Sequence, residues 1–76
     1  MIQNRRTRRS VWRVSRARAE RLSIPVPLIV LAIEAEIPAA TISLFERGLA
    51  RLTPEQEARR SAALARLREE AEAAAR

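Results

Sequence analysis

Arginine is the residue type whose number and placement in this 76-residue sequence best suit a defined chemistry. All fifteen basic residues are arginine, all nine acidic residues are glutamate, and the net charge is +6. A guanidinium group stays charged at any working pH and binds phosphate through paired hydrogen bonds. Residues 1–21 carry a net charge of +7, whereas residues 22–53 and 54–76 carry −1 and 0. This asymmetry predicts a polyanionic partner, and nucleic acid above all.

Other kinds of site chemistry lack their usual side chains. The sequence contains no cysteine, histidine or aspartate, so the common zinc and haem ligands are missing. The Cys–His and Ser–His nucleophilic pairs are excluded for the same reason. We therefore expect a protein that is not an enzyme, with no catalytic residues, no metal site and no cofactor.

One apolar run, Ile24–Ile33, resembles the core of a signal peptide at first sight. It spans ten residues and contains two prolines, whereas a membrane-spanning helix needs about 20 apolar residues. We expect no membrane contact and a cytoplasmic location.

The elements that position the arginines are predicted to be helices throughout. Residues 1–10 have little apolar content and are predicted to be a disordered basic arm. Ser10 is a suitable N-cap for a first helix over residues 11–22. Because each precedes a proline, Ile24 and Val26 are expected to be extended.

Three further helices are predicted after the prolines. They cover residues 27–35, 38–47 and 54–75, which places a proline at the start of each. Gly48 is suited to a left-handed stop after the third helix, and Thr53 with Gln56 forms a capping-box pattern before the fourth. The predicted fold is a small all-α domain of about four helices over residues 11–76, with a long C-terminal helix.

The region from residue 28 to 47 reads LIVLAIEAEIPAATISLFER and is followed by Gly48. Its ordered elements are Leu31-Ala32, an apolar Ile37 in the turn, Thr41-Ile42-Ser43 and Glu46-Arg47-Gly48. This order and spacing resemble the helix-turn-helix of the Cro-repressor, or XRE-type, family. Two positions depart from the family pattern: Glu36 stands where glycine is preferred, and Leu28 where a phosphate-contacting glutamine is frequent.

The resemblance implies a structural ion pair and a DNA-facing helix. Arg21 falls where the family has a first-helix arginine that pairs with the glutamate of the E-R-G string, here Glu46. The helix from 38 to 47 would lie in the major groove, with the arm on phosphates or in the minor groove. The expected DNA-binding residues are Arg5, Arg6, Arg8, Arg9, Arg13, Arg16, Arg18, Ala39, Ala40, Thr41, Ser43, Leu44 and Arg47. Ala39, Ala40 and Leu44 cannot donate hydrogen bonds to bases and could contact only thymine methyl groups.

The resemblance also implies a function. We expect a sequence-specific transcriptional regulator, a repressor of phage, mobile-element or antitoxin type, encoded by a bacterium or phage. It would bind double-stranded DNA as a homodimer on an inverted repeat. The fourth helix is the preferred dimer surface, because its apolar stripe extends beyond the core against which it can pack.

Two alternatives remain open on the sequence. The apolar second helix, with Ile29 and Ile33 among its residues, predicts an exposed surface and favours a protein-interaction module that binds a second protein. The arginine-rich stretch from Arg5 to Leu22 resembles peptides that fold on RNA hairpins and favours an RNA binder.

Overall fold

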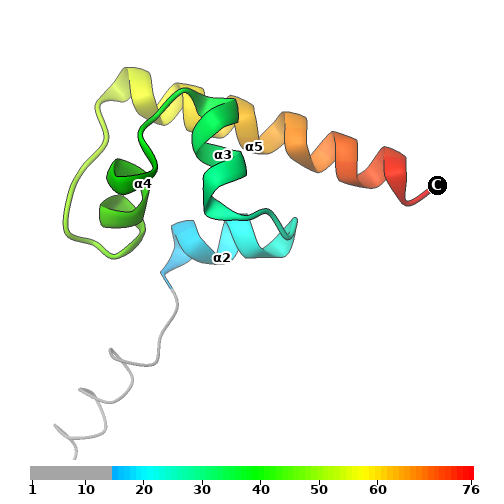
Figure 1. Ribbon diagram of the computed structural model, residues 1–76, viewed down its shortest axis with the longest axis horizontal. Coiled ribbons are helices and arrows are strands. Elements are labelled where there is room, and N and C mark those ends of the chain that lie inside the picture. The colour runs from blue at the N-terminus through cyan, green and yellow to red at the C-terminus, as the bar shows by residue number, and fades with distance from the viewer. Residues whose placement is uncertain (1–14) are drawn as a thin grey trace, which may run out of the picture.

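The computed structural model describes residues 15–76 and places four helices in them. They are α2 (Arg16–Ser23), α3 (Leu28–Ala35), α4 (Ala39–Glu46) and α5 (Pro54–Ala74). The predicted all-α class and the long C-terminal helix are confirmed. Figure 1 shows α3 between α5 and α2, with α4 beside α3. Because α3 packs on both α4 and α5, it is the central element of the fold.

The helix predicted over residues 11–22 differs from α2 at both ends. Ser15 has extended backbone and accepts a hydrogen bond from the Arg18 N–H through its side chain, so α2 begins at Arg16. The predicted N-cap, Ser10, lies outside the described residues. Ile24 closes α2 with helical backbone angles (φ −82°, ψ −20°), so its predicted extended conformation is wrong. The Ile24 N–H donates to the Arg21 carbonyl, and the Ile24 side chain is buried. The hydrogen bond and the burial both stabilise this conformation against the steric clash with the following proline.

The remaining helix ends lie within one residue of the predicted ones, but Pro27 and Pro38 are the N-caps of α3 and α4 rather than their first helical residues. Glu36 ends α3 in the left-handed region (φ 59°), and Gly48 follows α4 at φ 76°. Thr53 and Gln56 form a complete capping box, in which each side chain bonds to the other residue's backbone N–H. These caps satisfy backbone groups that a helix end leaves without partners.

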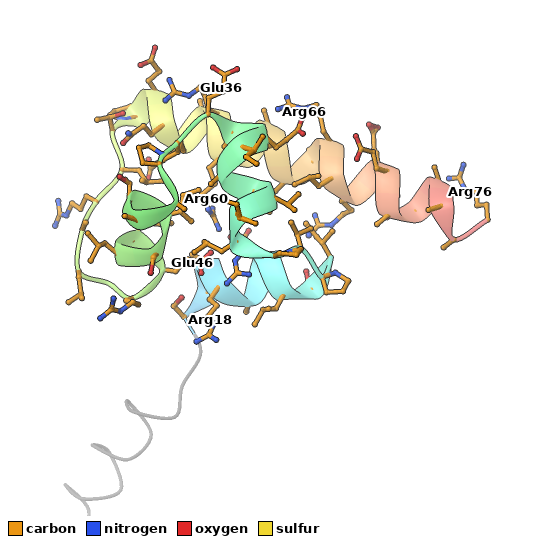
Figure 2. The ribbon with its side chains drawn as sticks, viewed as in Figure 1. Arg18, Glu36, Glu46, Arg60, Arg66 and Arg76 are labelled. Atoms are coloured by element: carbon orange, nitrogen blue, oxygen red, sulfur yellow. The ribbon has the colours of Figure 1, made fainter. Side chains whose placement is uncertain are left out.

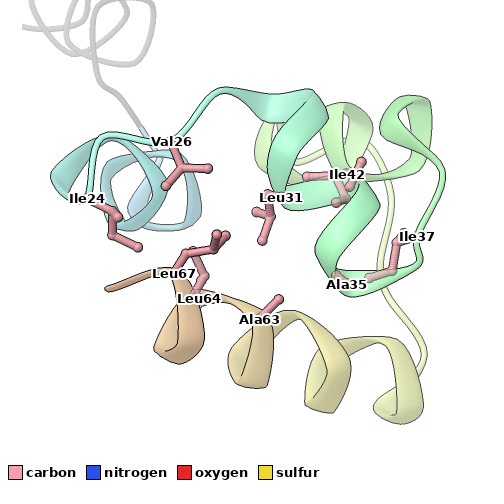
Figure 3. Close-up of a cluster of buried hydrophobic side chains, with 10 residues drawn as sticks. Ile24, Val26, Leu31, Ala35, Ile37, Ile42, Ala63, Leu64 and Leu67 are labelled. Atoms are coloured by element: carbon pink, nitrogen blue, oxygen red, sulfur yellow. The ribbon is translucent and has the colours of Figure 1, made fainter. Parts of the chain in front are cut away.

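The core lies where α3 meets α4, α5 and the loop after α2 (Figure 3). Leu31 and Ile42 are fully buried, as the motif alignment predicts. The cluster of buried side chains consists of Ile24, Val26, Leu31, Ala32, Ala35, Ile37, Ile42, Ala63, Leu64 and Leu67. Phe45 of α4 is half-buried and lies outside this cluster.

Only the first half of the α5 apolar stripe is used by this core. Ala63, Leu64 and Leu67 are buried, whereas Ala71 and Ala74 are exposed. Arg66 of α5 pairs with Glu34 of α3, with 2.8 Å between Nε and Oε2. α5 is therefore tied to α3 by its first four turns.

Within residues 15–76, no single helix is long and apolar enough to cross a membrane. α3 and α4 together have sufficient length and apolar content, but they are bent by 116° at their junction.

Candidate nucleic-acid interface

A buried ion pair joins α2 to the end of α4. Arg21 donates from Nε to Oε2 of Glu46 at 2.8 Å and from Nη2 to Oε1 at 2.9 Å. Its Nη1 donates to the Val26 carbonyl at 2.9 Å, so the guanidinium also fixes the loop before α3. The hydrogen bonds that Arg21 donates to the Glu46 carboxylate raise the pKa of Arg21 above its ordinary value, so the arginine stays charged. The pairing implied by the family resemblance is present in the structure.

The angle between α3 and α4 suits a helix-turn-helix. Three residues, Glu36–Pro38, join the two helices, which are bent by 116°. Arg59 of α5 donates to the carbonyls of Ala35 and Glu36, at 3.1 Å and 3.3 Å. These carbonyls end α3 and lack helical partners, so α5 supports the turn from outside the motif.

A surface pocket of about 270 Å³ lies between α2, the start of α3 and the end of α4. It is lined by Arg18, Arg21, Leu28, Ser43, Glu46 and Arg47. Arg21 and Glu46 neutralise each other, so the positive charge of the pocket comes from Arg18 and Arg47. Within the part of the chain that the structure describes, neither of these two arginines is paired with a carboxylate. Figure 2 shows Glu46 between α4 and α2, and Arg18 at the edge of α2. The pocket can accept an anionic oxygen group such as a phosphate.

The outward face of α4 is apolar next to this pocket. Ala40 and Leu44 lie four positions apart and are both exposed, with Leu44 at 40% exposure. Thr41 and Ser43 are half-buried on either side. Ala39, which was expected to face bases, is partly buried and packs against the core. The α4 surface therefore combines small apolar side chains with a positively charged margin.

Some of the arginines predicted to bind DNA lie within the described residues, and the others lie outside them. Arg16, Arg18 and Arg47 are exposed and lie on or next to helices α2 and α4. Arg18 and Arg47 line the same surface pocket and are the pair that the fold brings together. The others predicted to bind DNA lie outside the described residues: Arg5, Arg6, Arg8, Arg9 and Arg13.

A buried arginine on α5 was missed by the sequence analysis. Arg60 donates from Nη2 to the Ala17 carbonyl at 3.0 Å and to Glu20 Oε1 at 3.3 Å. Its guanidinium lies over the Phe45 ring, 5.2 Å from the centroid. Arg60 thus holds α2 and α4 together from α5. Arg60 lies three residues before the buried Ala63 and therefore on the same face of α5. This spacing is the feature of the sequence that indicates its burial.

Comparison with protein families, with curated proteins and with solved structures gives no match for this chain.

Proposed function

We propose that this protein is a small DNA-binding transcriptional regulator, with α4 as its recognition helix. It binds double-stranded DNA as a homodimer on an inverted repeat and acts as a repressor of phage, mobile-element or antitoxin type. The observation that carries the proposal is the pocket formed by Arg18 and Arg47 beside the exposed face of α4. Two unpaired arginines next to a protruding helix suit a phosphate at the margin of a DNA groove.

The resemblance to the Cro-repressor family supports the same proposal. The Arg21–Glu46 pair and the bent α3–α4 unit agree with what that resemblance implies. The net charge of +7 in residues 1–21 adds an electrostatic attraction to any nucleic acid. Phosphate contacts of this kind position a protein on DNA, whereas the face of α4 would supply sequence preference.

A gel-shift series across salt concentrations tests the proposal. The unmodified protein is titrated on duplex DNA and on a hairpin RNA, and the logarithm of the binding constant is plotted against that of the salt concentration. We expect duplex binding with a steep slope. The Arg18→Gln/Arg47→Gln variant is expected to lower the slope by about 0.9, because the two arginines share one phosphate and each phosphate contact contributes about 0.9.

The matched control is the Arg68→Gln/Arg76→Gln variant. It removes the same charge from exposed positions towards the far end of α5 and is expected to keep the slope. Equal slopes for the two variants would argue against the pocket as a phosphate site. Preference for the hairpin RNA over every duplex would overturn the proposal in favour of an RNA binder.

A second candidate function is a protein-interaction module on a helix-turn-helix scaffold. It is favoured by the outer face of α3, where Ile29 is 56% exposed and Ile33 71% exposed. Exposed apolar patches on small proteins mark contact surfaces. A protein that binds no nucleic acid at any salt concentration would leave this candidate as the better one.

A further inference from the structure

The two exposed side chains of α4 can recognise only one feature of a base pair. Ala40 and Leu44 are exposed, and they carry no hydrogen-bond donor or acceptor. The polar side chains on either side, Thr41 and Ser43, are half-buried. In the major groove the feature open to an apolar side chain is the C5 methyl group of thymine. We infer that α4 reads duplex DNA through thymine methyl groups, an inference that rests on the proposed function.

The position of the positive charge favours DNA over a protein partner on this face. Ser43 and Arg47 of the α4 region line the same pocket as Arg18, so the apolar face is bordered by two unpaired arginines. A phosphate in the pocket would bring the adjoining bases up against α4. An apolar protein partner would instead have to cover these two charges or leave them at its margin. The patch is also small, since it consists of the methyl group of Ala40 and the isobutyl group of Leu44.

The spacing on the helix sets the spacing of the bases. Leu44 lies four positions after Ala40, which corresponds to about 6 Å along the helix axis. Successive bases on one strand are about 3.4 Å apart. With α4 along the groove, the two side chains therefore contact methyl groups about two base-pair steps apart.

Uracil substitution provides the test, because uracil differs from thymine only by lacking this methyl group. A binding site is first selected from a random duplex pool and then resynthesised with uracil at one thymine position at a time. We expect two positions, about two steps apart, where uracil weakens binding about fourfold, as the loss of one buried methyl group predicts. A 5-methylcytosine–guanine pair at these positions should bind more tightly than an unmethylated one, since it restores the methyl group.

Two protein variants separate direct contact from an effect of the methyl group on DNA shape. Leu44→Ala shortens the contacting side chain and should bring the thymine-to-uracil ratio at one of the two positions close to 1. Leu22→Ala removes the same atoms from an exposed leucine on α2 and should keep the ratio of the unmodified protein, whatever its overall affinity. An effect that acts only through DNA shape would leave the ratio unchanged in both variants and would overturn the inference.

The outcomes also distinguish this inference from the proposed function. Equal binding to the thymine and uracil duplexes, with strong binding to both, overturns methyl recognition and leaves the regulator proposal standing. Failure to select any duplex from the pool overturns both.

Discussion

Arg59 donates a hydrogen bond to the carbonyl of Glu36 at 3.3 Å, and so links α5 to the turn between α3 and α4. Among the described residues, Glu36 is the non-glycine residue with positive φ, at 59°. Left-handed backbone costs a residue with a side chain about 1 kcal/mol or more. Because Arg59 bonds to the backbone of Glu36 and of Ala35, the support does not depend on the glutamate side chain. The strained turn and its external support therefore belong to the same structural unit.

We predict that Glu36→Gly stabilises the domain by about 1 kcal/mol or less, because glycine adopts positive φ without a steric cost. A rise in melting temperature of several degrees is expected from a gain of that size in so small a domain. Ala65→Gly, at an exposed helical position on α5, is the opposite control and should destabilise by about 1 kcal/mol. A lower melting temperature for Glu36→Gly would show that the glutamate side chain has a stabilising role.

The buried ion pair gives a second prediction. Glu46→Ala should destabilise the domain by about 3 kcal/mol, because it leaves the buried Arg21 guanidinium without its bidentate partner. Urea denaturation measures the change. Glu55→Ala is the matched control, since the Glu55 side chain is 82% exposed and its pairing with Arg59 is a surface contact. That control should cost less than 1 kcal/mol, and similar losses for both variants would refute a special role for Glu46.

Much of the fold was predictable because its signals are local. The left-handed stop at Gly48 and the Thr53–Gln56 capping box can each be predicted from a few neighbouring residues, and both are confirmed. The Arg21–Glu46 pair joins residues 25 positions apart, but the spacing of a known motif was enough to predict it.

The misses share a dependence on tertiary contacts. Ile24 was expected to be extended, but its buried side chain and the closing hydrogen bond of α2 override the proline preference. Arg60 was overlooked because a charged side chain is rarely buried, and its partners come from helices about 40 residues away. Arg66 and Glu34 lie 32 residues apart, and their pairing likewise depends on the packing of α5 on α3.

The N-terminal arginines give a third prediction, which follows from sequence alone because they lie outside the described residues. Deleting residues 1–9 removes four arginines and should lower the salt slope of DNA binding by up to about 4. The deleted segment contains little apolar surface, so the circular dichroism spectrum and melting temperature should stay close to those of the full chain. Unchanged affinity and slope would exclude these arginines from the interface.

The last prediction concerns the homodimer, whose subunit contact the structure favours on α3 rather than on α5. The sequence analysis preferred α5, but Leu67 is buried in the chain's own core. The exposed part of the α5 stripe holds alanines, which offer little surface to a partner. On α3, by contrast, Ile29, Val30 and Ile33 are 56%, 39% and 71% exposed. These residues lie on the side of the helix opposite Leu31 and Ala35, which are buried.

We therefore predict a homodimer that forms through the outer face of α3. Burying a fully exposed aliphatic side chain gains about 1.5–3 kcal/mol, and a two-fold contact buries each of these residues twice. Sedimentation equilibrium at micromolar concentration should give twice the chain mass of 8.6 kDa. Ile33→Glu should reduce the mass to that of one chain, because a carboxylate would be placed in an apolar contact. Leu49→Glu introduces the same charge at a residue 64% exposed in the loop after α4, and this variant should remain dimeric. A single-chain mass for the unmodified protein, or a dimer that survives Ile33→Glu, would remove α3 as the subunit contact. The inverted-repeat mode of binding would then need a different source of two-fold symmetry.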